Sequence, residues 1–414
     1  MNRLILLLLC LASNALTAPA NHWPGWLGPN RDGWVKDFTP PKQWPAKLQH
    51  NWQVPVGEGY GSPLVVGDRV FLHTRQGEDE VLRCLRLADG SEIWRKNHPT
   101  PFKIGGGGEY HGKGPKACPV YADGRLFVMS ISGTLSAWDA ANGKPLWRRD
   151  YRSRFAKNYP FWGASGSPLV DGPRVIAHFG NDKEGVLAAL DAKTGRELWT
   201  QGNDGTCYSS PFMAAPAGVR QVIEWNHRAL VGVDRVTGRK LWDHPFPHLT
   251  HNQNMPTPSF HNGRVLLGGE NRGLHSIQPI LRDGKWTTTT RWSQRGVALD
   301  MASTIMNNGH LYGLSHFGRG RFFCVNPMDG KILWQTDGRE ANHATFLAFP
   351  GHVMTLTDRG QLHLIAANPK AHQRLASWKV SETPTWAPPV LLPNGQLLIK
   401  GKDTLTCWKL SGGN

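Results

Sequence analysis

One short segment determines the architecture of this chain: Asp191-Ala192-Lys193-Thr194-Gly195-Arg196-Glu197-Leu198-Trp199. The residues just before it, 186–190, form an apolar run of strand length. The aspartate ends that run, and the glycine tolerates the positive φ angle that a tight hairpin turn needs. The leucine and tryptophan that follow favour a half-buried strand. The segment therefore predicts two strands joined by a tight turn, with a tryptophan on the second strand.

The same pattern recurs along the chain at nearly regular intervals. Clear copies end at Trp147, Trp242 and Trp334, and a shortened copy ends at Trp94. With weaker copies included, the tryptophans in register stand at positions 52, 94, 147, 199, 242, 292, 334 and 378. Repeats of roughly 40–50 residues, each with four short strands, are typical of β-propeller blades.

The two ends of the repeat region complement each other. Eight strand openings rich in small residues occur, such as Gly166-Ser167-Pro168-Leu169. The last repeat stops after Trp408 without an outer strand, whereas the strand around Trp52 has no hairpin before it. Pairing these two would remove exposed sheet edges. We therefore predict an all-β fold, an eight-bladed β-propeller of four-stranded antiparallel blades over residues 51–411, in which an N-terminal strand completes the last blade and closes the ring.

The first fifty residues lie outside the repeats. Residues 1–20 combine Arg3 with a short apolar run and end in Ala18-Pro19-Ala20, which is typical of a secretory signal peptide. The run is too short to span a bilayer. The residues before Cys10 do not match a lipidation site, so we expect export to the periplasm or the medium without a lipid anchor. Residues 21–50 predict a strap that buries its aromatic residues against the propeller, and a binding role for the strap is the alternative.

Composition restricts the class of partner. The net charge of +16 suits contact with anionic envelope polymers or lipid headgroups, but the basic residues are spread through the blade turns. No arginine-rich stripe or nucleic-acid motif occurs, so we expect no nucleic-acid partner. We expect no transmembrane segment and a monomeric chain. Cys84, Cys324 and Cys407 occupy matching positions in different blades, too far apart for disulfides, and predict buried free thiols.

The repeats, together with Trp23-Pro24-Gly25-Trp26 and Thr385-Trp386-Ala387-Pro388-Pro389, resemble the PQQ-type eight-bladed β-propellers. That family includes quinoprotein alcohol dehydrogenases and the outer-membrane assembly lipoprotein BamB, and the resemblance is greatest to exported bacterial PQQ-like repeat proteins. It covers roughly residues 23–411. It implies the fold and leaves the activity open, since one fold hosts many functions. Quinone dehydrogenases of this fold resemble one another: each has a vicinal disulfide over the quinone PQQ, a Ca²⁺ ion and an aspartate base. This chain has no adjacent cysteines.

Connections between blades gather at one mouth of a propeller, and several here are longer than a turn needs. Polar and aromatic groups that converge on one concavity predict a small-molecule or peptide site. The candidate ligand-binding residues of this axial funnel are Glu109, Tyr110, His111, Trp162, Asn203, Asp204, His251, Asn254, Asp300, His343 and Trp386. The pattern predicts no catalytic residue.

Several residues of these connections carry two interpretations. His248 and His251 are either metal ligands or ordinary loop histidines. Asp204 or Asp300, with neighbouring carboxylate and amide oxygens, either hold Ca²⁺ or form ordinary hydrogen bonds. The glycines 105–108 form a phosphate cradle or a flexible loop. Trp162 and Trp386 either stack on a flat ligand or pack in the core. No metal site is assigned from the sequence.

These patterns together predict an exported, non-catalytic propeller that binds a protein, peptide or glycan in the cell envelope. The resemblance leaves two alternatives open. One is a PQQ- and Ca²⁺-dependent dehydrogenase, for which PQQ and Ca²⁺ would be the cofactors. The other is an outer-membrane assembly subunit similar to BamB.

Overall fold

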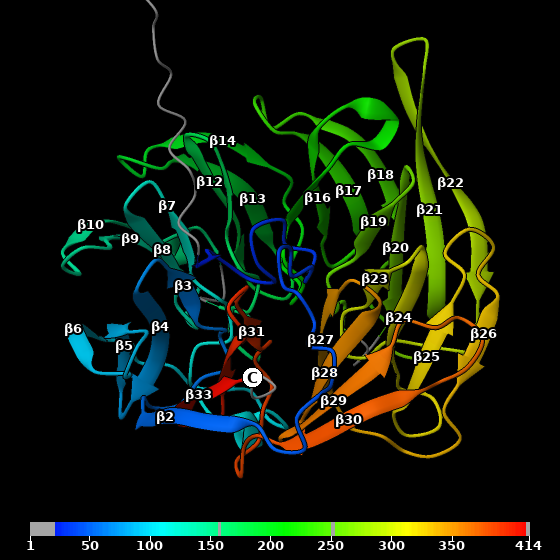
Figure 1. Ribbon diagram of the computed structural model, residues 1–414. Helices are drawn as coiled ribbons and strands as arrows, with labels where there is room; N and C mark the ends of the chain where they lie inside the picture. Colours follow the sequence, from blue (N-terminus) through cyan, green and yellow to red (C-terminus); the bar gives the residue numbers. More distant parts are fainter. Residues whose placement is uncertain (1–20, 156–158, 250–252, 411–414) are drawn as a thin grey trace, which may run out of the picture.

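Eight antiparallel β-sheets stand around a common axis and form a closed ring (Figure 1). The computed structural model describes residues 21–155, 159–249 and 253–410. The segment 1–20, predicted to be a signal peptide, and the candidate His251 lie outside the described residues. The prediction of an all-β, eight-bladed propeller is confirmed. The helices in the described part of the chain are single 3-10 turns, far shorter than a bilayer span requires.

The first four blades follow one another in the chain, each running from the axis outward. Blade 1 contains β3 (Leu64–Val66), β4 (Arg69–Gln76), β5 (Asp79–Arg86) and β6 (Glu92–Pro99). Blade 2 contains β7 (Val120–Ala122), β8 (Arg125–Met129), β9 (Leu135–Asp139) and β10 (Pro145–Arg149). Blade 3 contains β11 (Leu169–Asp171), β12 (Arg174–Gly180), β13 (Gly185–Asp191) and β14 (Glu197–Gln201). Blade 4 contains β15 (Phe212–Ala214), β16 (Gln221–Trp225), β17 (Ala229–Asp234) and β18 (Lys240–Pro245).

The other four blades complete the ring. Blade 5 contains β19 (Ser259–His261), β20 (Arg264–Gly269) and the long hairpin β21 (Gly273–Arg282) and β22 (Lys285–Gln294), which projects from the ring in Figure 1. Blade 6 contains β23 (Ile305–Asn307), β24 (His310–Ser315), β25 (Arg321–Val325) and β26 (Ile332–Gln335). Blade 7 contains β27 (Ala344–Phe349), β28 (His352–Thr357), β29 (Gln361–Ala366) and β30 (Arg374–Lys379). Blade 8 contains β31 (Val390–Leu391), β32 (Gln396–Lys400), β33 (Thr404–Lys409) and β2 (Gln49–Pro55). Three 3-10 turns lie in the connections: η1 (Glu109–His111), η2 (Arg152–Arg154) and η3 (Pro216–Gly218).

The recurring turn also joins neighbouring blades. The Asp191 side chain accepts hydrogen bonds from the backbone N–H groups of Lys193 and Thr194, at 3.1 and 2.8 Å. Gly195 has a φ of 69°, and a Cβ there would lie 2.6 Å from the ring of Trp147, the outer-strand tryptophan of blade 2. That indole donates a hydrogen bond to the Ala192 carbonyl at 3.1 Å. The glycine is therefore required both for the turn and for close approach of the tryptophan from the preceding blade.

The predicted ring closure is confirmed. Strand β2 pairs antiparallel with β33, with Gln53 opposite Thr406. Trp52 then makes the same inter-blade contact as the other tryptophans: its indole donates to the Leu87 carbonyl at 2.9 Å and its ring lies against Gly90 of blade 1. The chain's first and last blade strands therefore share one sheet.

Residues 21–48 form a strap, drawn dark blue in Figure 1, that crosses the middle of the ring and follows blade 7 to β2. It begins with β1 (His22–Trp23), which adds a fifth strand to blade 1 beside β3. Further on, the backbone N–H of Val35 donates to the Ala348 carbonyl at 2.7 Å, and the Phe38 ring packs edge-on against Phe349. The strap is thus attached to blades on both sides of the axis.

Arg31 of the strap fastens it inside the ring. Its guanidinium donates hydrogen bonds to the carbonyls of Pro168 at 2.8 Å, Ser167 at 3.1 Å and Pro211 at 3.2 Å, which start the innermost strands of blades 3 and 4. It also lies 5.4 Å from the centre of the Trp26 ring. Burial lowers the pKa of Arg31 to about 10, so the group stays charged at neutral pH. Arg31 therefore attaches the strap to the starts of the innermost strands of blades 3 and 4.

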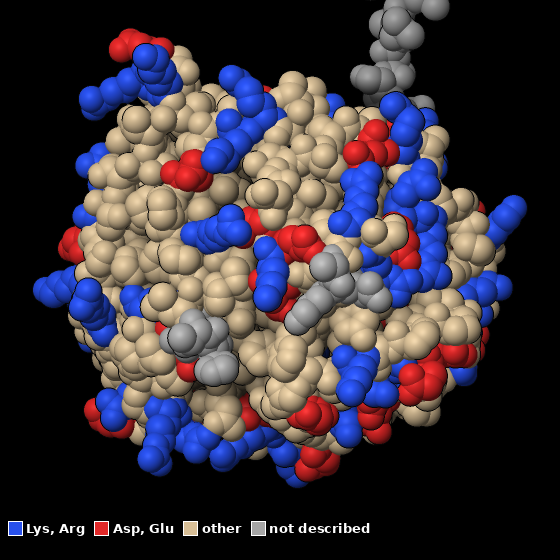
Figure 2. Space-filling view, turned by 180° about the vertical axis from the view of Figure 1, so that it is seen from behind, with Lys and Arg blue, Asp and Glu red and all other residues tan. Residues whose placement is uncertain are grey.

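Apolar contacts between neighbouring blades form most of the core, and the five cysteines of the described residues are buried free thiols. On the surface, Lys and Arg spread over much of the face in Figure 2 and its rim, with Asp and Glu among them. This pattern suits a solvated surface better than a single anion-binding patch.

Candidate functional site

The axial funnel contains a cavity of about 330 Å³. Its lining comes from the connections between blades, from the start of β27 and from Trp26 and Leu27 of the strap. Five predicted ligand-binding residues line it: Tyr110, His111, Trp162, His343 and Trp386. They come from four different inter-blade connections, so the repeat geometry brings them together although they are far apart in the sequence.

Trp386 is the centre of an aromatic wall in this cavity. The His343 ring stacks on it with centroids 4.5 Å apart and planes 17° apart. The His111 ring meets it edge-on at 4.4 Å, and Tyr60 lies at 6.2 Å. On the blade 2–blade 3 connection, Trp162 packs against Tyr208 at 5.6 Å. The cavity thus offers large, rigid apolar surfaces together with polar ring edges.

The other predicted funnel residues do not line this cavity. Glu109 lies in a neighbouring surface hollow with Glu58 and Lys113. Asp204 is buried and its carboxylate accepts from the backbone N–H groups of Gly205 and Arg228. Neither of these two carboxylates therefore reaches the axial cavity.

Asn203, Asn254 and Asp300 also do not line the axial cavity. The buried Asn254 side chain donates to the Asn226 carbonyl at 2.8 Å, and Asn203 is exposed. Burial raises the pKa of Asp300 to about 6, with a further contribution from the nearby charge of Glu270. Asp300 is not among the residues that line the cavity.

A row of small polar residues at the strand openings was not identified from the sequence. Each side chain accepts a hydrogen bond from the backbone N–H of the equivalent residue one blade earlier. These bonds run from Cys118 to Ser167, Ser167 to Ser210, Ser210 to Thr257 and Thr257 to Ser303, at 2.9 to 3.0 Å. Aligning the openings would have revealed it, because the hydroxyl recurs at one position of the repeat. These hydrogen bonds link the strand openings of blades 2 to 6, and the residues that make them line the cavity.

Lys116 is a second cavity residue that the sequence did not single out. Its ammonium donates to the Trp162 carbonyl at 2.7 Å, and burial lowers its pKa to about 8. It supplies positive charge beside an otherwise aromatic and hydroxyl-lined surface.

We expect the free energy of unfolding to fall in acid because of His343 in the aromatic wall. Burial lowers the pKa of His343 to about 4, from an ordinary value of 6.5, despite the opposing charge of Asp358. Since the folded-state pKa is depressed, the stability from neutral His343 is present above pH 6.5 and is lost as the pH falls towards 4, by roughly 3 kcal/mol. Urea unfolding at pH 7.5 and 4.5 should therefore show a smaller pH effect in His343→Phe than in the wild type. Equal pH effects in the two proteins would contradict this assignment.

The comparisons with known proteins agree with the repeat pattern. The protein family described as outer membrane protein assembly factor BamB matches residues 78–336, more than half of the chain. The chain belongs to this BamB family. BamB of Moranella endobia (strain PCIT) is 24% identical over 315 residues, covering 73% of this chain and 76% of that relative. The crystal structure of BamB from Moraxella catarrhalis has a TM-score of 0.64 at 16% identity and covers 89% of this chain and 99% of that structure, which supports the fold alone.

Similarity also extends to a quinone enzyme. Quinohemoprotein alcohol dehydrogenase ADH-IIG of Pseudomonas putida is 26% identical over 195 residues, but the match spans 44% of this chain and only 26% of that enzyme. Two features expected of a PQQ and Ca²⁺ site do not meet in the funnel: adjacent cysteines are absent from the sequence, and Asp204 does not line the cavity. Within the described residues, the one cluster of three side chains with metal-ligating atoms close together is His73, Glu80 and His98, which lies in blade 1 and not in the funnel.

Proposed function

We propose that this BamB-family chain is a non-catalytic binding propeller of the bacterial cell envelope, and that its axial funnel binds a segment of an envelope polypeptide. The observation that carries the proposal is the aromatic wall around Trp386 in a cavity that Trp26 and Leu27 of the strap also line. Relatives of this chain are named as outer membrane protein assembly factors. That name supports a polypeptide partner over a small metabolite. We propose that residues 1–20 direct export and that the mature chain works as a monomer.

The chemistry of the cavity favours an extended segment with aromatic or apolar side chains. Its size is at the low end of ligand pockets, enough for one or two side chains. Rigid aromatic residues bury much area at low entropic cost, as in other peptide-binding sites. Strands of outer-membrane barrels alternate apolar and polar residues and carry aromatic residues near their ends. Such a strand would insert its aromatic side chains against Trp386 and leave its polar side chains near Lys116 and the mouth.

Removing the Trp386 indole should abolish most of this binding. We expect ten-residue peptides that alternate aromatic and polar residues to bind the wild type, and Trp386→Ala to bind at least tenfold more weakly, since buried tryptophans are common binding hot spots. Isothermal titration calorimetry measures the affinities. The matched control is Val236→Ala, which truncates an exposed apolar residue in the blade 4 turn, outside the funnel. Equal affinities in the wild type and Trp386→Ala would contradict the proposal, and selective binding of oligosaccharides in place of peptides would reassign the ligand to a glycan.

A PQQ- and Ca²⁺-dependent dehydrogenase is the second candidate. The observation in its favour is the similarity to the Pseudomonas putida enzyme. Titration with PQQ and CaCl₂, followed by absorbance and by dye-linked oxidation of alcohols, separates the two functions. Saturable PQQ binding with turnover would replace the binding function by this one.

A further inference from the structure

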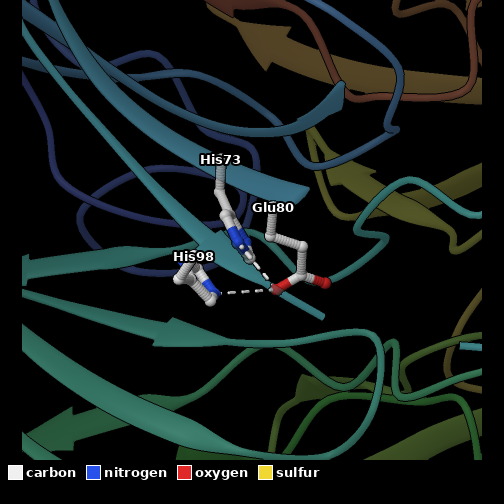
Figure 3. Close-up of side chains that lie close together, drawn as sticks. All are labelled: His73, Glu80 and His98. Atoms are coloured by element: carbon white, nitrogen blue, oxygen red, sulfur yellow. Dashed lines mark ion pairs between the residues drawn. The ribbon is translucent and has the colours of Figure 1, made fainter. Parts of the chain in front are cut away.

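Three metal-ligating side chains meet between blades 1 and 2, away from the funnel. His73 comes from β4, Glu80 from β5 and His98 from β6, and the sheet register places His98 directly opposite Glu80. Figure 3 shows both imidazoles directed at the same carboxylate oxygen. His73 and Glu80 are fully buried, and the His98 side chain is 17% exposed.

The distances in this cluster match the edges of a coordination tetrahedron. Nε2 of His73 lies 3.2 Å from Oε2 of Glu80, and Nε2 of His98 lies 3.3 Å from the same oxygen. The three ligand atoms all lie within 4.8 Å of one another. Zinc–nitrogen and zinc–oxygen bonds of about 2.0–2.1 Å in tetrahedral geometry place ligand atoms roughly 3.3 Å apart.

Hydrogen bonding alone does not satisfy the cluster. Nε2 of His73 and Oε2 of Glu80 are both buried and close, yet neither has a partner aligned as a hydrogen bond. Nδ1 of His73 and Nδ1 of His98 are likewise buried without a hydrogen-bond partner. Buried polar atoms are normally paired, so several unpaired atoms in one place indicate that they share a ligand. Lone pairs that converge on a cation, and not on each other, account for both the short distances and the poor alignment.

A contact from blade 2 holds the Glu80 carboxylate in place, and a cavity adjoins the cluster beside His98. The backbone N–H of Ile131 in blade 2 donates to Oε1 of Glu80 at 2.8 Å, which turns Oε2 towards the two histidines. A cavity of about 270 Å³ adjoins His98 and is lined by blade 2 residues that include Thr134 and Trp138. Oγ1 of Thr134 is also buried without a partner.

We propose that His73, Glu80 and His98 bind a divalent cation of the zinc class, with a fourth position that opens towards the cavity beside Thr134. Two imidazole nitrogens and one carboxylate oxygen are a ligand set that suits zinc, and three protein ligands leave room for a water molecule. Because the ligands come from three successive strands and the carboxylate contacts blade 2, the ion stabilises the first inter-blade contact after the ring closure.

Zinc binding to the chain of residues 21–414 tests this site. After treatment with EDTA and dialysis, calorimetric titration with ZnCl₂ should give one equivalent of bound zinc and a higher melting temperature. Co²⁺ in place of zinc should give the visible absorption of a four-coordinate site. His98→Ala, at the exposed edge of the cluster, should weaken zinc binding at least tenfold, whereas the control His310→Ala on blade 6 should leave it unchanged.

A second variant separates binding from folding. Glu80→Gln keeps the length of the side chain and an oxygen for the Ile131 N–H, but it removes the anionic ligand, so zinc affinity should fall at least tenfold while the circular dichroism spectrum stays that of the wild type. No stoichiometric zinc binding by folded wild-type protein would overturn the proposal. Unchanged affinity in His98→Ala would also overturn it, because the zinc would then be bound elsewhere.

Discussion

A chain shortened to begin at residue 57 is expected to lose its cooperative fold and to aggregate. It lacks β2, so β33 keeps an unpaired edge and blade 8 loses its outer strand. It also lacks Trp52, whose ring lies against Gly90 and joins blade 8 to blade 1. Size-exclusion chromatography and thermal unfolding followed by near-ultraviolet circular dichroism measure the effect.

A chain that begins at residue 47 is the matched control. It keeps β2 and the Trp52 contact but loses Arg31, Phe38 and the rest of the strap that lies in the ring. We expect it to remain folded and monomeric with a lower melting temperature. If the chain that begins at residue 57 unfolds as cooperatively as this control, the ring does not depend on β2.

Replacing Arg31 by methionine should cost on the order of 4 kcal/mol in the free energy of unfolding. The guanidinium donates to three carbonyls at the starts of innermost strands, those of Ser167, Pro168 and Pro211. Hydrogen bonds to charged groups contribute about 1.5–3 kcal/mol each, and buried carbonyls left without donors cost about 1–3 kcal/mol. Guanidinium chloride unfolding measures the loss. Arg31→Lys should recover part of it, because an ammonium keeps the charge but not the planar fork.

Arg264→Met provides the comparison for this substitution. Arg264 also donates to a backbone carbonyl, that of Met328 at 2.7 Å, but this contact is exposed and water can replace it. We expect that variant to lose less than about 1 kcal/mol. Similar losses in the two variants would show that Arg31 has no special role in holding the strap within the ring.

The blade pattern was readable from the sequence because its cause is local. The turn chemistry of Asp191 and Gly195 recurs in several blades, and the closing strand followed from counting strands at the two ends. The contacts that the tryptophans make between blades could not be predicted from the sequence. Trp147 was predicted to lie on a strand, but its contact with the turn of the next blade depends on how neighbouring sheets pack. The position of Arg31 has no periodic signal, since the strap is irregular and contacts backbone atoms.

The sequence likewise predicted some residues of the candidate site and not others. The aromatic residues His111, Trp162 and Trp386 were expected in the funnel and line the cavity, because bulky rings on inter-blade connections have few other places to pack. Asp204 was expected there too, but residue type does not reveal that its carboxylate is already bonded to Gly205 of its own connection and to Arg228 of the β16–β17 turn. The His73 cluster was missed because its members stand in three separate strands, and only strand register places them on one face.

Hydrogen–deuterium exchange with and without a bound alternating aromatic peptide tests most directly whether the funnel is the binding site. We expect slower exchange in residues 107–116 and 386–388 when peptide is present, with no change in the outer strands β6 and β10. Slower exchange confined to outer strands, with both funnel segments unchanged, would contradict it.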